Sequence, residues 1–77
     1  MNPTPFELFH QAHHIDSAAI RKRIQDLGLK EEFHYRDVEK NQVDAHEFQE
    51  RGGLGLPAIW TGDEFIYGRQ EIEKYLD

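Results

Sequence analysis

The sequence contains no cysteine, and this absence excludes several kinds of chemistry. No disulfide can form, no thiolate can act as a nucleophile, and no thiolate can bind a metal. Small secreted domains usually depend on disulfides for their stability, so a cysteine-free chain suits the reducing interior of a cell. We therefore expect a cytoplasmic protein.

Long apolar runs and an excess of positive charge are also missing. The first residues, MNPTPFELF, have neither the basic segment nor the apolar length of a signal peptide or a membrane span. Nine Lys and Arg face fifteen Asp and Glu, which gives a formal net charge of -6. An acidic domain repels nucleic acid and anionic membranes unless its basic residues gather in one patch. The basic run at residues 21–23 is interpreted as a solvated helix face, so we predict neither a nucleic-acid partner nor a membrane partner.

The 77 residues are enough for one small domain, which we assign to the whole range 1–77. Apolar spacing predicts strands at residues 6–10 and 32–38, and a hairpin around Gly62-Asp63 at residues 56–68. Helices are predicted at residues 17–29, 43–53 and 69–77. The order is β-α-β, then α, then β-β-α. Two parallel strands joined by a helical crossover, followed by a hairpin and a helix, predict an α/β fold with a four-stranded mixed sheet.

The ends and faces of the predicted helices follow from single residues. Asp16 or Ser17 is expected to cap the first helix, and Gly28 to end it in a left-handed turn. The second helix is expected to bury Val43 or Ala45 together with Phe48. The third is expected to bury the apolar positions Ile72, Tyr75 and Leu76.

Residues 51–76, RGGLGLPAIWTGDEFIYGRQEIEKYL, resemble the glutaredoxin branch of the thioredoxin-fold proteins. The pair Gly52-Gly53 ends a helix, Leu56-Pro57 opens a strand where that family has Val-Pro, and a hairpin glycine and Gly68 follow in order. The strand EFHYRDV matches the family's pattern at Asp37 and Val38. The resemblance implies a thioredoxin-like β-α-β-α-β-β-α fold with strand order 4-3-1-2, the third strand antiparallel to the others, and helices on both faces.

The same resemblance locates the loop that carries Cys-x-x-Cys or Cys-x-x-Ser in glutaredoxins. Here the four positions are His14, Ile15, Asp16 and Ser17, and a slip of one residue puts His13 at the first of them. Imidazole cannot form a mixed disulfide, so thiol-disulfide exchange is not available to this chain. We therefore predict a degenerate active-site loop at residues 13–17, no catalytic residues, and no enzymatic activity of the redox kind.

The resemblance also implies a ligand groove that needs no sulfur. Pro57 matches the family's cis-proline, which leaves the backbone of Leu56 free to pair with an extended peptide. In glutathione-binding relatives a lysine precedes the cysteine motif, and that position falls at Gln11 or His10. An acidic residue begins the last helix there, and Gln70 or Glu71 stands in its place. The predicted groove, with weak glutathione binding as the single cofactor expectation, consists of Gln11, Leu56, Pro57, Gly68 and Gln70.

Two further interpretations of the histidine-rich segment stay open. His10, His13 and His14, with Asp16 as a further ligand, have spacings that would suit a zinc-like site, whereas the plainer interpretation is an exposed polar loop. His14, Asp16 and Ser17 also contain the residue types of a hydrolytic triad, but consecutive residues that enter a helix are expected to splay around its axis. We expect His34 and His46 to lie on the surface.

The favoured function is a non-catalytic binding or interaction module with a residual groove for a peptide or a thiol compound. Its partner would be an unknown protein or a thiol-containing peptide. The first alternative is a glutathione-binding accessory to a thiol-disulfide oxidoreductase system. The second is a histidine-based metal-binding domain.

Overall fold

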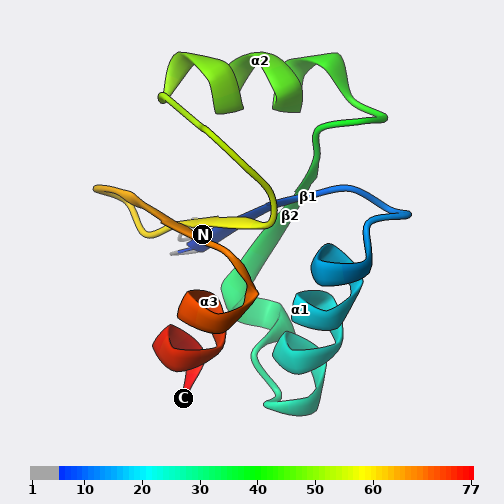
Figure 1. The fold of residues 1–77 in the computed structure, drawn as a ribbon, viewed down its shortest axis with the longest axis vertical. Helices are drawn as coiled ribbons and strands as arrows, with labels where there is room; N and C mark the ends of the chain where they lie inside the picture. The colour runs from blue at the N-terminus through cyan, green and yellow to red at the C-terminus, as the bar shows by residue number, and fades with distance from the viewer. Residues whose placement is uncertain (1–5) are drawn as a thin grey trace.

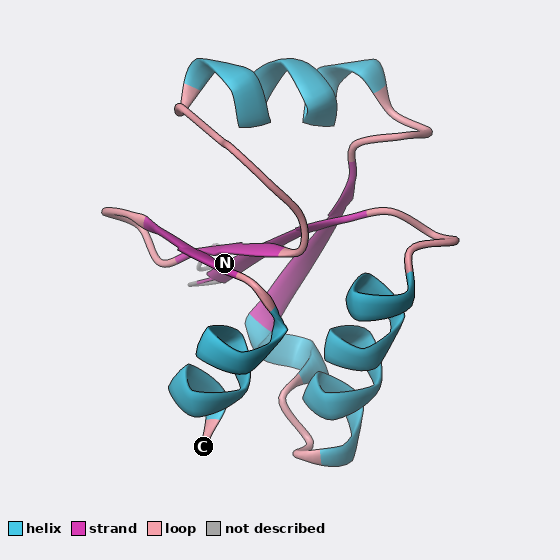
Figure 2. Cartoon of the chain, viewed as in Figure 1, coloured by secondary structure: helices cyan, strands magenta, loops and turns pink. Residues whose placement is uncertain are grey.

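The computed structural model describes residues 6–77, in which strands and helices follow one another in the predicted order (Figures 1 and 2). A single 3-10 turn at Lys30–Glu32, which the sequence analysis did not predict, leads into the second strand. No helix within residues 6–77 combines the length and the apolar character needed to cross a membrane. The elements are β1 (Phe6–His10), α1 (Ile15–Asp26), β2 (Phe33–Asp37), α2 (Gln42–Glu50), β3 (Ala58–Trp60), β4 (Phe65–Tyr67) and α3 (Arg69–Leu76).

The four strands form one mixed sheet in the order β2-β1-β3-β4, which is the expected order 4-3-1-2 counted from the other edge. β1 pairs in parallel with β2, and Leu8 lies opposite Tyr35. β3 runs antiparallel to both β1 and β4, with Ile59 opposite Leu8 on one side and Ile66 on the other. Figure 1 shows α1 and α3 together beneath the sheet and α2 alone above it. The expectation of helices on both faces is confirmed.

The two faces of the sheet are built from different chemistry, because successive strand residues point to opposite sides. Leu8 packs on the face of α1 and α3, within a core of buried, mostly aliphatic side chains. Phe9 points to the opposite face, where its ring lies 5.2 Å from that of Phe48 on α2. The α2 face also carries Arg36, which is 6% exposed. The buried residues of the α1 and α3 core are Leu8, Ile20, Ile24, Phe33, Ile59 and Ile72.

The start of α1 corrects the sequence analysis, whereas its end confirms it. The cap is His14, whose side chain accepts the Ser17 amide, and the helix begins at Ile15. Asp16 and Ser17 are therefore inside the first turn and are not caps. At the other end, Gly28 adopts a φ of 71°, and the Leu29 amide donates to the carbonyl of Ile24 at 2.9 Å. This left-handed ending is the one expected of a glycine at that position.

The buried faces of α2 and α3 are narrower than predicted. Val43 is 64% exposed in the first turn of α2, where its amide donates to the side chain of the capping Asn41. Ala45 and Phe48 are half-buried instead. Ile72 is fully buried on α3, whereas Tyr75 is 44% exposed and contacts the ring of Phe6 only edge-on.

Candidate functional site

The loop that resembles a redox motif is organised by His14 and Ser17. The Ser17 amide donates to His14 Nδ1 at 3.3 Å, and Ser17 Oγ lies 3.0 Å from the same nitrogen. A backbone amide can only donate, so Nδ1 is the acceptor and the neutral ring carries its proton on Nε2. Ser17 Oγ in turn accepts the Gln11 amide at 3.3 Å. The two positions that would hold cysteines in a glutaredoxin therefore close the first turn of α1.

The expectation that His14 and Ser17 splay apart is wrong, but their pairing does not make a nucleophile. Ser17 shares a helix face with Ile20 and Ile24, and all three side chains are fully buried. A hydroxyl in this position cannot reach a substrate. Asp16 is exposed and lies on a different face of the helix, so no carboxylate orients the imidazole as a triad requires.

Arg21 holds the same loop from the opposite side, which corrects the interpretation of residues 21–23 as a solvated face. Its Nη1 donates to the carbonyl of Gln11 at 3.0 Å, and its Nη2 donates to that of Ala12 at 3.0 Å. Nη1 also lies 2.9 Å from His10 Nδ1, and His10 is 7% exposed. A guanidinium has no lone pair to offer, so it must donate to an unprotonated His10. One arginine thus fixes the backbone between β1 and α1.

The His10–Arg21 contact predicts a pH dependence of folding. Burial and the positive charge of Arg21 lower the pKa of His10 below its usual 6.5, against the opposing attraction of Asp37 and Asp44. The stability that neutral His10 contributes is therefore fully present above pH 6.5. It is lost as the pH falls through the lowered pKa of His10 in the folded state. Urea unfolding at several pH values should show this loss. His10→Asn should remove it, whereas His13→Asn, at an exposed position, should leave it in place.

Four of the five predicted groove residues, Leu56, Pro57, Gly68 and Gln70, lie at or beside the beginning of α3. The Leu56–Pro57 peptide bond is cis, and the Gly68 amide donates to the carbonyl of Pro57 at 3.2 Å. This contact joins the two halves of the predicted groove. A pocket of about 450 Å³ opens next to it and is lined by Asp16, Tyr67, Gly68, Arg69, Gln70 and Glu71.

Of the predicted site residues, Asp16, Gly68 and Gln70 come together in this pocket. The other predicted groove residues, Gln11, Leu56 and Pro57, do not line it. The Gln11 amide donates to Ser17 Oγ, Leu56 is half-buried, and Pro57 is fully buried. Among the exposed loop residues, Ile15 is 79% exposed. His13 is exposed as well.

Tyr67 is one of two pocket residues, with Arg69, that were not predicted from the sequence as part of the site. Its hydroxyl accepts the Leu54 amide at 3.2 Å and donates to the carbonyl of Gly52 at 3.4 Å. It therefore ties the segment before Pro57 to β4. Its position directly before Gly68 in the pattern EFIYG was the one sequence signal that could have identified it.

The histidines do not converge on a metal-binding geometry. Within residues 6–77, no three side chains among His, Cys, Asp and Glu lie close enough to hold a metal ion. His10 is engaged by Arg21 and His14 by Ser17. His34 and His46 are exposed, as expected.

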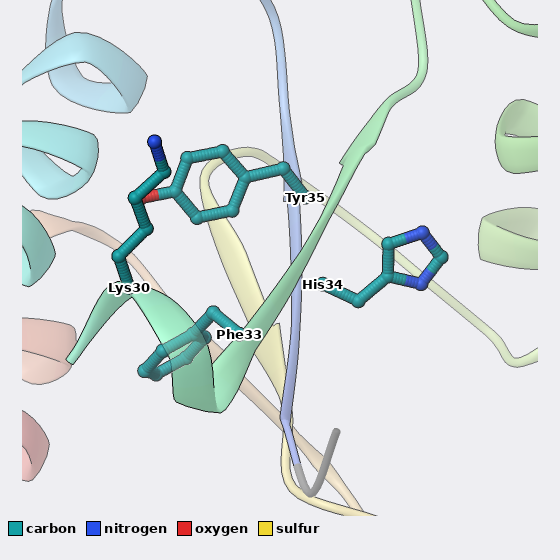
Figure 3. A pocket seen from close by; sticks show the side chains of 4 residues that line it. All are labelled: Lys30, Phe33, His34 and Tyr35. Carbon is teal, nitrogen blue, oxygen red and sulfur yellow. The ribbon is translucent and has the colours of Figure 1, made fainter. Parts of the chain in front are cut away.

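A second hollow, more apolar than the groove, lies at the edge strand β2 (Figure 3). It has a volume of about 400 Å³ and is lined by Lys30, Phe33, His34 and Tyr35. Figure 3 shows Lys30, Phe33 and Tyr35 on one side of β2, with His34 pointing away on the other. None of these residues belongs to the degenerate loop or to the predicted groove, and we assign no function to this pocket.

Comparison with known proteins defines the fold class. No family model matches this sequence, and no curated protein matches it either. Among solved structures, the chain is similar to the crystal structure of a mutant of the thioredoxin-like protein BC3987. The two superpose with a TM-score of 0.76 at 12% sequence identity, over 94% of this chain and 99% of the other.

The chain therefore has a thioredoxin-like fold, and it combines that fold with a complete absence of cysteine. At this level of identity the likeness concerns the fold alone. The narrower resemblance to glutaredoxins remains an inference from the sequence.

Proposed function

We propose that this chain is a non-redox thioredoxin-like binding domain that holds an extended peptide segment along Leu56. The carrying observation is the pocket beside the Gly68–Pro57 hydrogen bond, next to backbone that is free to pair. Within residues 6–77, neither the amide nor the carbonyl of Leu56 has a hydrogen-bond partner. A peptide strand can supply both bonds, since main-chain pairing requires no side-chain chemistry and no sulfur.

The surroundings of the pocket favour a neutral or basic peptide with an apolar side chain. Asp16 and Glu71 bring negative charge to its lining, and Arg69 is partly neutralised by Glu73 at 3.2 Å. Two large apolar residues are connected to its lining through the backbone: Ile15 precedes Asp16 in the chain, and the Leu54 amide donates to the Tyr67 hydroxyl. Leu54 is 88% exposed. Exposed apolar side chains beside a polar pocket are typical of a contact surface for another molecule.

Glutathione is the second candidate ligand for the same groove. Arg69 and the first amides of α3 could receive one of its carboxylates. Asp16 and Glu71 oppose this, because they bring like charge to the same lining. We therefore expect glutathione to bind more weakly than a neutral peptide that can form a strand.

NMR titration of the amide resonances tests the proposal. A capped, uncharged peptide of alternating valine and threonine should shift Leu56, Gly68 and Gln70, and glutathione should shift them less at equal concentration. Leu54→Glu should weaken the peptide-induced shifts. The matched control is Val43→Glu, because Val43 is also exposed but lies on α2. If neither ligand shifts these amides at millimolar concentration, the groove does not bind extended ligands and the proposal is wrong.

A further inference from the structure

Helix α2 is attached to the sheet differently from α1. Ser17, Ile20 and Ile24 of α1 are fully buried, whereas α2 contributes no fully buried residue. Its inner face consists of half-buried side chains, of which Phe48 is the only large apolar one. A helix of nine residues is not stable alone in water, so its folded state depends on these contacts.

Charge pairs make up much of the attachment. Asp44 Oδ1 lies 2.6 Å from Arg36 Nε, and Glu47 Oε2 lies 2.5 Å from Arg36 Nη2. Arg51, which caps the end of α2, contacts Glu7 Oε2 on β1 at 2.6 Å and Glu47 Oε2 at 3.0 Å. Two of the three carboxylates of α2, Asp44 and Glu47, together with its capping arginine thus hold the helix to two neighbouring strands.

The sheet side of this network is balanced without α2. Arg36 on β2 also pairs with Glu7 on β1, and this pair joins two strands of the sheet. If α2 leaves, the sheet keeps one cation with one anion, and Asp44 and Glu47 gain water. An isolated buried charge would make such an opening very costly, but none is created here.

An aromatic surface lies beneath the helix. Phe48 contacts both Phe9 and Phe65, with ring centroids 5.2 Å apart in each case. Trp60 packs on Phe65 at 4.8 Å and lies 5.1 Å from the guanidinium of Arg51. These three sheet residues, Phe9, Trp60 and Phe65, lose their contacts with Phe48 and Arg51 when α2 departs.

We propose that α2 is an electrostatically held cover, which opens as a unit from the sheet while α1, α3 and the strands stay folded. Its opening uncovers the aromatic surface of Phe9, Trp60 and Phe65. The charges of Asp44 and Glu47 set how often it opens. Opening does not require the groove to bind any ligand, so this proposal and the proposed function can fail separately.

Native-state hydrogen exchange on the unmodified chain is the first test. The amides of α2, such as Ala45, whose amide donates to the carbonyl of Asn41 at 3.1 Å, should exchange through an opening that leaves α1 and β1 protected. In low denaturant, the α2 amides should therefore show a lower opening free energy than those of α1. Equal opening free energies for α1 and α2 would mean one cooperative unit and would overturn the proposal.

Two variants test the role of charge. Asp44→Asn should increase the α2 opening roughly tenfold or more, because one charge-assisted hydrogen bond is lost, and should leave α1 exchange unchanged. Trp60 is the sole tryptophan, so its fluorescence reports the same event. Asp26→Asn is the matched control, since it removes an exposed ion pair on α1. Should Asp44→Asn fail to fold, Glu47→Gln replaces it. A variant that increases the amide exchange rates of α1 and α2 equally contradicts the proposal.

Discussion

Replacing Phe9 with alanine should lower the free energy of unfolding by about 4 kcal/mol, the usual cost of removing a buried phenylalanine ring. Phe9 is fully buried on β1, a central strand of the sheet. Its ring contacts Phe48 and Phe65 at 5.2 and 5.7 Å between centroids. The guanidinium of Arg36 lies 5.2 Å from its centre. Alanine would therefore leave a cavity between a strand and a helix that has no buried side chain of its own.

Urea unfolding followed by circular dichroism measures this effect. Phe9→Leu keeps much of the volume and should cost clearly less than Phe9→Ala. Val43→Ala removes an exposed apolar side chain from α2 and should change stability by less than about 0.5 kcal/mol. A loss of less than about 1.5 kcal/mol for Phe9→Ala would mean that the cavity collapses or that α2 does not pack on this face.

The fold could be predicted from the sequence where local signals and burial agree. The β1 segment FELFH has the same bounds in the structure as in the prediction, and the crossover into β2 and the hairpin around Gly62-Asp63 are both confirmed. Gly28 ended α1 as predicted because its left-handed conformation is a local property of the backbone. These features depend on neighbours within a few residues.

The contacts that hold α2 to the sheet could not be predicted from local sequence signals. Glu7 pairs with Arg36 and Arg51, which are 29 and 44 residues away in the chain. Nothing in the pattern of a single helix shows which charged residue will turn inward. Arg21 is a second example. Its place in a basic run predicted a solvent-exposed side chain, whereas in the structure it contacts His10. Long-range pairs of charges become visible only when the topology is known.

The candidate site was located by resemblance and refined by geometry. The positions His14 and Ser17 were identified as those that carry sulfur in glutaredoxins, but their pairing was not foreseen. It arises because the helix begins at Ile15, which makes His14 the cap and turns Ser17 toward the core. In this chain the loop therefore has a structural role. What is left accessible is backbone and exposed apolar surface, which is why we favour binding over catalysis.

Replacing Arg36 with methionine should destabilise the fold by about 3 kcal/mol near neutral pH, because it removes a buried cation from a set of partly buried carboxylates. The Arg36 side chain is 8% exposed, and it is the common partner of Glu7, Asp44 and Glu47. These bonds outweigh its burial and raise its pKa further, so it stays charged at any ordinary pH. Methionine fills similar space but leaves Glu7 and Glu47 with only Arg51 and removes the arginine that pairs with Asp44.

The dependence of this loss on pH separates a charge effect from a packing effect. Burial would raise the pKa of Glu7, but its bonds to Arg51 and Arg36 outweigh burial and lower it below the usual 4.5. The stability that ionised Glu7 contributes is therefore fully present above pH 4.5 and is lost as the pH falls through the lowered pKa. In Arg36→Met the pKa of Glu7 returns toward its usual value. The difference in the free energy of unfolding between the unmodified chain and Arg36→Met should therefore become smaller as the pH falls. A gap that stays constant in acid would show that Arg36 acts through its packing on Phe9. Lys22→Met, which breaks an exposed pair, should change stability little at any pH.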